Sequence, residues 1–347
     1  MKKAFRKKSI LVIGGTGSIG SEIVRQLIAH DSTVIRVLSN DEDGLFKLQE
    51  ELKEHGNLRF LYGDIRDKSR IQRAIEGIDI VFHAAALKHV PLCEYNPFEA
   101  IQTNVIGTQN IIEVSLNEEV DKMIMISTDK AVNPINTMGA TKLLAEKIMS
   151  DANHYAGLRK TKFSSVRFGN VLSSRGSVLH SFRDQIKAGG PVTLTSLDMT
   201  RYIMSINQSV DLVLKAVTLM QGGEIFVLKA MDSLKIKDLA EVMITELGPI
   251  YGYKDQDIQC KVIGLRPGEK LHELLMTENE YEGVLETEEM LIIPSKRIVP
   301  FVEVDESYPL IKVSENEKRS SDKVDFLTKK EIKNLLSNAG FFEREKE

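Results

Sequence analysis

The chain has 347 residues, 42% hydrophobic and 28% charged, which is usual for a globular protein that buries a core of its own. Its 46 basic and 50 acidic residues are spread along the chain and leave a net charge of −4, which excludes the electrostatic footprint of a nucleic-acid or anionic-membrane binder. Two cysteines are too few for a disulfide framework or a CxxC metal site, so we expect reduced thiols and no metal.

The basic N-terminus does not predict a signal peptide. The letters MKKAFRKK resemble the start of one, but the apolar run after them, Ile10 to Ile13, ends at glycines. No run approaches the roughly 18 apolar residues of a membrane-spanning helix. We therefore expect neither secretion nor membrane insertion, and a cytoplasmic location.

Short β-branched runs alternate with helical segments through the first half of the chain. In order, we expect a strand in SILVIGG, a helix from about Ser18, a strand in TVIRVLS, a helix around Leu45 to Lys53, strands in LRFLYGD and DIVFHAAA, a helix near Asn104 to Leu116, a strand in KMIMIST, a helix from about Met138 and a strand in FSSVRFGNV. This alternation predicts an α/β fold, with a Rossmann-type doubly wound parallel sheet covered by helices on both faces.

Beyond about Asn170 the alternation breaks into shorter elements, which predicts a smaller, discontinuous C-terminal lobe. The segment Glu278 to Asp322 is rich in Glu, Ser and Lys and is expected to consist mostly of loops, and an amphipathic helix is expected over Thr328 to Asn338. We expect residues 1–170 to form the Rossmann domain, with later segments returning to it. Residues 171–290 then form the second lobe, and 291–347 a C-terminal extension.

The segment GGTGSIG lies between the first strand and the first helix. Gly14, Gly17 and Gly20 allow a tight turn and close backbone approach to a pyrophosphate, whose charge then faces free amides at the helix N-terminus. Asp64 follows the third strand in GDIRD, where its carboxylate can hold the adenine amino group. Together these features predict a dinucleotide site.

The residues after the second strand favour NADP over NAD. NAD-preferring Rossmann proteins have an acidic residue there, which pairs with the ribose 2′-hydroxyl and repels a 2′-phosphate. This chain has Ser39 and Asn40, whose donors tolerate phosphate, although Asp41 and Glu42 follow at once and no arginine sits at the turn.

The strand KMIMIS runs into Ser127, Thr128, Asp129 and Lys130, and MGATK follows. In the short-chain dehydrogenase pattern a Tyr and a Lys four residues apart share a helix face, and the Lys orients the nicotinamide ribose and activates the Tyr as a base. Lys142 matches that Lys, but Met138 occupies the Tyr position and cannot exchange protons.

Residues 9 to about 275 resemble the UDP-N-acetylglucosamine 4,6-dehydratases of bacterial surface-glycan synthesis, a CapD-like branch of the extended short-chain dehydrogenases. The matching segments are GGTGSIGSE, GDIRD, HAAALKHVPLCEYNP, TNVIGTQN, STDKAVNPIN, MGATK, RFGNVLSSRGSV, DMTRY, GGEIFV and GLRPGEKLHE. Some members of this branch have Met where others keep the Tyr, so Met138 departs from the superfamily but not from the branch.

The resemblance implies oxidation of a UDP-sugar at carbon 4, loss of water across carbons 5 and 6, and return of the hydride to carbon 6. Lys130 as an amine is the candidate base for the carbon-5 proton, and Asp129 the candidate acid for the departing hydroxyl. Asp129 is also the nearest candidate for the carbon-4 base, relayed through Thr128 or a ribose hydroxyl. Retention or inversion at carbon 5 stays open.

Other residues are assigned by position or by the resemblance. Arg201 and Arg266 are expected to bind the UDP diphosphate and ribose, with Glu269 bracing a ribose hydroxyl or Arg266. Lys88 is expected to contact cofactor or substrate at the carboxyl edge of the sheet. The predicted cofactor contacts are Gly14, Thr16, Gly17, Ser18, Ile19, Gly20, Ser39, Asn40, Asp64, Ile65, Ala84, Ala85, Ala86, Lys88 and Lys142; the predicted substrate contacts are Lys88, Asn170, Ser177, Arg201, Arg266 and Glu269.

Each assignment has a plainer alternative. Asp129 and Lys130 can be an ordinary salt bridge at a strand end, Met138 an apolar wall, and the arginines and Lys88 solvated surface residues. As alternative functions, a UDP-sugar 4-epimerase or an enzyme acting on an already dehydrated sugar would use the same cofactor. A non-catalytic NADP-binding regulator would explain the missing Tyr. The resemblance also implies a homo-oligomer, with dimers, tetramers and hexamers all represented.

Overall fold

The computed structural model describes residues 2–172, 174–229, 231–295 and 320–342. The chain divides into two compact units that interleave along the sequence. Unit 1 comprises Met1–Phe168, Asn207–Ala230 and Met276–Glu317, and unit 2 comprises Gly169–Ile206, Met231–Leu275 and Lys318–Glu347. The expectation set boundaries at residues 170 and 290, with later segments returning to the first domain, and in the structure the chain passes between the two units several times after Phe168.

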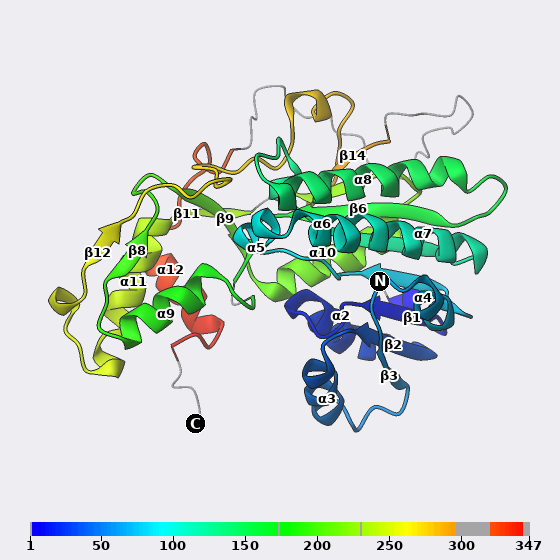
Figure 1. The fold of residues 1–347 in the computed structure, drawn as a ribbon, viewed down its shortest axis with the longest axis horizontal. Helices are drawn as coiled ribbons and strands as arrows, with labels where there is room; N and C mark the ends of the chain where they lie inside the picture. Colours follow the sequence, from blue (N-terminus) through cyan, green and yellow to red (C-terminus); the bar gives the residue numbers. More distant parts are fainter. Residues whose placement is uncertain (1, 173, 230, 296–319, 343–347) are drawn as a thin grey trace. The chain divides into compact units, whose positions relative to one another are not determined.

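A large sheet forms the centre of unit 1 (Figure 1). Its described strands are β1 (Ser9–Ile13), β2 (Val34–Ser39), β3 (Leu58–Tyr62), β4 (Ile80–His83), β5 (Lys122–Thr128), β6 (Lys162–Phe168), β10 (Ile225–Leu228), β13 (Leu285–Glu286) and β14 (Met290–Ile293). They lie in the order β13-β14-β10-β6-β5-β4-β1-β2-β3, parallel from β10 to β3 and antiparallel at the β13 edge. The expected α/β fold is confirmed, and the strand order reverses between β1 and β4, where doubly wound sheets bind their ligands.

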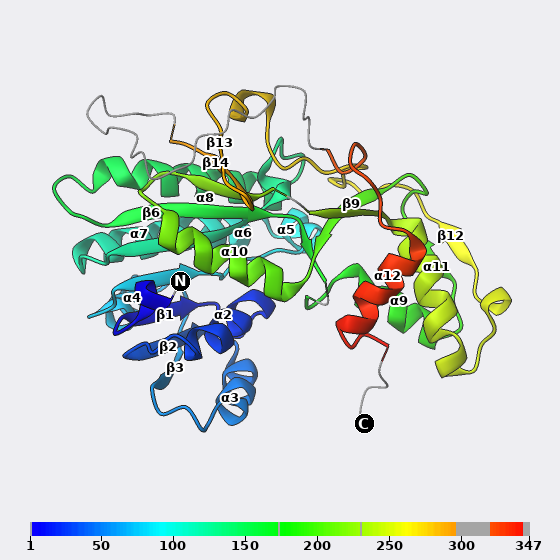
Figure 2. The same cartoon turned by 180° about the vertical axis from the view of Figure 1, so that it is seen from behind.

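Helices cover both faces of this sheet (Figures 1 and 2). The helices of unit 1 are α1 (Lys2–Phe5), α2 (Ser18–Ile28), α3 (Glu42–Glu51), α4 (Lys68–Ile75), α5 (Val90–Tyr95), α6 (Pro97–Ile101), a π-helix (Gln102–Ile106), α7 (Gly107–Asn117), α8 (Thr137–Tyr155) and α10 (Ile206–Leu219). Apolar residues of α4, α7 and α8 form one buried cluster with Leu11, Met123 and Phe163 of the sheet. Figure 2 shows α2 and α10 on the other face. Among the described helices, none is both long enough and apolar enough to cross a bilayer.

Three local expectations need correction. The helix expected over Leu45 to Lys53 begins earlier, at Glu42, because the Asp41 carboxylate accepts a hydrogen bond from the Gly44 amide and caps it. The helix expected from Asn104 is a π-helix that leads into α7. The segment from Glu278 is not only loop, because β13 and β14 extend the sheet there; residues 296–319 of that expectation lie outside the described residues.

Unit 2 is built from short strands and three longer helices. Its elements are β7 (Asn170–Val171), α9 (Val178–Lys187), β8 (Val192–Leu194), β9 (Thr200–Met204), β11 (Asp232–Lys235), α11 (Ile236–Leu247), β12 (Cys260–Val262) and α12 (Lys329–Asn338). The order β11-β9-β7 forms one small sheet, and β12 pairs with β8. The expected terminal helix is present as α12, and its Ile332 and Leu336 are buried with residues of α9 and α11 in the core of this unit.

A fully buried ion cluster holds three parts of unit 1 together. Arg167, near the end of β6, is 0% exposed, and its guanidinium donates to both carboxylate oxygens of Glu146 on α8, at 3.1 and 2.6 Å. It also donates to both oxygens of Glu280, at 3.0 Å each. Because Glu280 lies in the segment that returns to unit 1 before β13, one cation joins β6, α8 and that segment.

We predict that Arg167→Met lowers the free energy of unfolding by about 3–5 kcal/mol, because two buried carboxylates lose their shared cation. Burial raises the pKa of Glu280 but its bonds to Arg167 lower it, and the net pKa is lowered. The stabilisation is therefore full above the unfolded pKa of about 4.3 and is lost as the pH falls through the lower folded pKa.

Urea unfolding from pH 7 downward measures the difference between wild type and Arg167→Met. The exposed Arg159 provides a control, because Arg159→Met is expected to change the free energy of unfolding by less than about 0.5 kcal/mol. Equal unfolding midpoints for the two variants would show that the cluster contributes nothing.

Candidate active site

The glycine loop forms a turn at the carboxyl end of β1. Gly14 has φ +75°, and a Cβ atom added there would lie 2.6 Å from the Ala85 nitrogen. A Cβ on Gly20 would lie 2.2 Å from the Gly14 carbonyl oxygen. Gly17 caps α2 without any side-chain hydrogen bond to the first amides of the helix. The turn therefore requires glycine and leaves the helix N-terminus suited to a pyrophosphate.

Side chains at the ends of β2 and β3 meet beside this turn. The Ser39 hydroxyl lies 2.7 Å from that of Thr16 and accepts from the Asp41 amide. The Asp64 carboxylate accepts from the Arg66 guanidinium at 2.8 and 3.0 Å and from the Asn40 amide at 3.2 Å. The hydrogen bonds from Arg66 hold the pKa of Asp64 below its usual value. Arg66 follows β3, so its guanidinium was not expected from the residues directly after the second strand.

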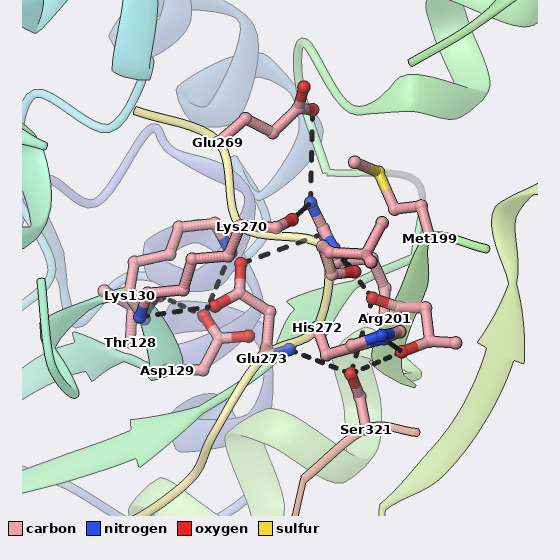
Figure 3. Close-up of polar contacts among 12 residues, drawn as sticks. Thr128, Asp129, Lys130, Met199, Arg201, Glu269, Lys270, His272, Glu273 and Ser321 are labelled. Carbon is pink, nitrogen blue, oxygen red and sulfur yellow. Dashed lines mark hydrogen bonds and ion pairs between the residues drawn. The ribbon is translucent and has the colours of Figure 1, made fainter. Parts of the chain in front are cut away.

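The segment Thr128–Asp129–Lys130 forms a compact polar group at the end of β5 (Figure 3). Asp129 is 0% exposed, and its Oδ1 accepts from the Lys130 ammonium at 2.9 Å and from the Thr128 hydroxyl at 2.8 Å. Its Oδ2 is also buried and has no hydrogen-bond partner among the described residues. The ion pair of the plainer alternative exists, but a buried carboxylate oxygen without a donor is costly and calls for a further partner such as a ligand hydroxyl.

Met138 and Lys142 lie on the first turns of α8. Met138 is 3% exposed and packs in a small apolar cluster with Cys93 and Ala100. Lys142 is 6% exposed, and its ammonium donates to the Ile126 carbonyl oxygen of β5 at 2.7 Å. Burial lowers the pKa of Lys142 to about 8, although Glu146 acts in the opposite direction. The amine is thus neutral in part near pH 8.

A second buried network, which the motifs did not reveal, fixes the loop after β4. The Asn104 side chain accepts from the Leu87 amide and donates to the Leu87 carbonyl and to the Thr141 hydroxyl, beside Lys142. His83 Nε2 lies 2.9 Å from the Thr108 hydroxyl. That hydroxyl donates to a carbonyl, so Nε2 carries the proton.

Burial and then the charge of Lys142 lower the pKa of His83 to about 3, so the imidazole is neutral. Lys88 is exposed at the end of the same loop, after Ala84, Ala85 and Ala86.

Five of the predicted substrate residues, Asn170, Ser177, Arg201, Arg266 and Glu269, belong to unit 2, whereas Lys88 belongs to unit 1. Arg201 on β9 is 7% exposed, and its guanidinium donates to the carbonyls of Thr200, Lys270 and Leu271 (Figure 3). Arg266 is exposed, and its backbone amide donates to the Glu269 carboxylate at 3.2 Å. Asn170 begins β7 and Ser177 caps α9, both half-buried. Arg201 thus supports the loop that carries Arg266, and the ligand contacts of all five residues remain predictions.

A glycine turn at the switch point of a parallel sheet, followed by STDK on the fifth strand and a buried Lys on the next helix, defines a protein of the short-chain dehydrogenase/reductase type. The chain belongs to the polysaccharide biosynthesis protein family, whose model matches residues 10–295. The family that the motifs predicted is therefore confirmed.

Several relatives and one solved structure are similar over nearly their whole length. A Methanocaldococcus jannaschii protein named as an uncharacterised membrane protein is 56% identical over 97% of each chain. A UDP-N-acetylglucosamine 4,6-dehydratase (inverting) of Campylobacter jejuni is 38% identical over 92% of this chain and 91% of its own. A UDP-glucose 4-epimerase of Rickettsia typhi is also 38% identical, over 98% of both. The X-ray structure of Pen from Bacillus thuringiensis matches with a TM-score of 0.88 and 43% identity, covering 96% of this chain and 98% of that one.

The lowered pKa of Lys142 predicts a specific dependence of stability on pH. Between pH 8 and 10.5 the unfolded chain holds the Lys142 proton more tightly than the folded chain, so the free energy of unfolding rises with pH in that window. Relative to a Lys142→Met variant, the cofactor-free wild type is expected to gain roughly 2–3 kcal/mol from pH 7.5 to 10.5. Urea unfolding of both proteins at a series of pH values measures the difference, and a flat difference would contradict the buried amine.

Proposed function

We propose that the protein is an NADP-dependent UDP-N-acetylglucosamine 4,6-dehydratase that makes a UDP-4-keto-6-deoxy-N-acetylhexosamine for surface-polysaccharide synthesis. The observation that carries the proposal is the Thr128–Asp129–Lys130 group, a hydroxyl, a buried carboxylate and an amine in mutual hydrogen-bond contact. Oxidation at carbon 4 with elimination across carbons 5 and 6 needs two proton-transferring groups, and this segment supplies both. Membership of the polysaccharide biosynthesis family and the dehydratase relative support the proposal.

The glycine turn fits a dinucleotide. A side chain at Gly14 or Gly20 would occupy the space of backbone atoms, and no side chain of Gly17 covers the N-terminus of α2, which suits a pyrophosphate. Ser39, Asn40 and Arg66 would contact the adenosine ribose. The positive charge of Arg66 favours NADP, because a guanidinium can bind the 2′-phosphate. A nicotinamide cofactor held there would supply the hydride chemistry, from carbon 4 and back to carbon 6. Lys142, held by the Ile126 carbonyl, is the residue that would orient the nicotinamide ribose.

The protons balance if Asp129 and Lys130 each act twice. Asp129 takes the carbon-4 hydroxyl proton through Thr128, whose hydroxyl already donates to the Asp129 carboxylate as such a relay requires. Asp129 then gives this proton to the carbon-6 hydroxyl, which departs as water. As a neutral amine, Lys130 removes the carbon-5 proton, and the resulting ammonium returns a proton to carbon 5 once the hydride has reached carbon 6. The net change is the loss of one water, without exchange of cofactor.

A UDP-sugar 4-epimerase is the second candidate, because the Rickettsia typhi relative named as an epimerase is as similar as the dehydratase. Epimerisation needs only proton transfer at the carbon-4 oxygen. Thr128 with Asp129 would be enough for it, and Lys130 would then be a structural partner of Asp129.

Incubation with UDP-N-acetylglucosamine separates these functions. We expect a product lighter by one water, with the alkaline absorbance of a 4-keto-6-deoxy sugar, and no consumption of added cofactor. Mass spectrometry of the nucleotide sugar and of the bound cofactor makes both measurements. A product of unchanged mass with galacto configuration would establish the epimerase, and no turnover of any UDP-sugar would favour a cofactor-binding regulator.

Two variants test the separate proton roles. Lys130→Ala is expected to reduce dehydration by about 10²–10⁴-fold and still allow the first oxidation, so reduced nicotinamide accumulates when substrate is added. Asp129→Asn is expected to lose both steps, because nothing receives the hydroxyl proton, and no reduced cofactor appears. Both variants should retain bound cofactor. The absorbance of reduced nicotinamide after mixing reports the difference.

The exposed Lys147 on α8 offers a matched control, and Lys147→Ala should turn over as the wild type does. Near-normal dehydration by Lys130→Ala would remove Lys130 from the mechanism, and accumulation of reduced cofactor in Asp129→Asn would remove Asp129 as the carbon-4 base.

A further inference from the structure

A serine near the C-terminus lies at the centre of unit 2. Ser321 is 0% exposed, and each of its polar groups has a partner. Its amide donates to the Glu273 carbonyl and its Oγ accepts from the Glu273 amide, both at 2.9 Å. Its carbonyl accepts from the Ser233 hydroxyl at 2.6 Å, and its Oγ lies 2.7 Å from the Thr200 hydroxyl. One residue therefore links the C-terminal segment to three others far away in sequence.

The partners of Ser321 hold the residues predicted to bind UDP. Thr200 precedes Arg201 on β9, and Glu273 lies in the RPGEKLHE segment that also contains Arg266 and Glu269. The Thr200 hydroxyl bonds to His272 Nδ1 at 2.8 Å, and the Thr200 amide donates to the Leu271 carbonyl. The Ser321 hydroxyl contacts both Thr200 and Glu273. Figure 3 shows these residues together with His272.

The segment that carries Ser321 is firmly anchored in the same unit. The Leu327 amide donates to the Ser233 carbonyl, and Phe326 forms a bridge with Ser233 of β11. Ile332 and Leu336 of α12 are both 0% exposed in the core of unit 2. The chain around Ser321 is thus anchored to β11 and, through α12, to the core of unit 2, in addition to its contacts with the RPGEKLHE segment.

We infer that the C-terminal segment is a positioning element of the nucleotide-sugar lobe, in which the Ser321 hydroxyl holds β9 and the RPGEKLHE segment in the arrangement that binds the UDP moiety. This inference rests on the proposed function. Without the hydroxyl, the Glu273 amide and the Thr200 hydroxyl lose a buried partner, and the segment with Arg266 and Glu269 is less preorganised. The loss should appear in binding of the nucleotide and not in the chemistry at Asp129 and Lys130.

The test uses full-length protein and measures UDP affinity by calorimetry, KM and kcat with UDP-N-acetylglucosamine, and affinity for NADP⁺. Ser321→Ala is expected to raise the Kd for UDP and the KM by about three- to tenfold, with kcat within twofold and NADP⁺ affinity unchanged. Thr200→Val keeps the shape but removes the second hydroxyl and should act in the same direction. Thr200→Ser restores that hydroxyl and should recover most of the affinity.

Ser337→Ala, at an exposed position of α12, is the matched control and should bind UDP as the wild type does. Thermal unfolding of each variant shows that it is folded, and if Ser321→Ala does not fold, the Thr200→Val and Thr200→Ser pair makes the same comparison. The inference would be overturned, and the proposed function would not, if Thr200→Val bound UDP as tightly as the wild type does. The same holds if Thr200→Ser bound UDP no more tightly than Thr200→Val. A wild-type protein that binds no UDP would overturn both the inference and the proposed function.

Discussion

Arg167 carries a positive charge into the dry interior of unit 1, and the arrangement around α8 depends on how that charge is neutralised. A buried guanidinium is tolerated only with well-placed carboxylates, and Glu146 and Glu280 each offer both oxygens to it. Since Glu146 is on α8 and Arg167 on β6, the bidentate contact fixes the helix against the strand both along its axis and in rotation. The helix with Met138 and Lys142 is therefore held by electrostatics in addition to apolar packing.

The same cluster explains how a lysine can be buried one turn away. Glu146 follows Lys142 by four residues and so faces the same side of α8. Its carboxylate is already shared with Arg167, and the desolvation of Lys142 prevails over the attraction of Glu146, so the pKa of the amine falls to about 8. The ammonium finds its acceptor in the Ile126 carbonyl instead.

Local patterns were enough to predict the fold and the position of the candidate site. The strand and helix periods, the glycine turn and STDK at a strand end are all read within windows of a few residues, and the parallel order then follows from general rules of α/β sheets. Features that depend on distant partners were not predictable. Asn40 after β2 donates to Asp64 after β3, Asn104 bonds across to Leu87 and Thr141, and Ser321 contacts Glu273 only in the folded chain.

Each unit is completed by a segment that arrives late in the chain. In unit 1, Glu280 supplies the second carboxylate for Arg167, and β14 then pairs with β10 to complete the described edge of the sheet. In unit 2, Ser321 hydrogen-bonds to Thr200 of β9, and α12 packs with α11 in the hydrophobic core. In a chain ending after β6, Arg167 would have Glu146 as its carboxylate partner but not Glu280. It would then either stay buried with that one partner or become exposed to water, with weaker packing of α8. Such non-local contacts form slowly. Because Glu280 and β14 follow most of unit 2 in the sequence, unit 1 reaches its final form only after most of unit 2 has been made.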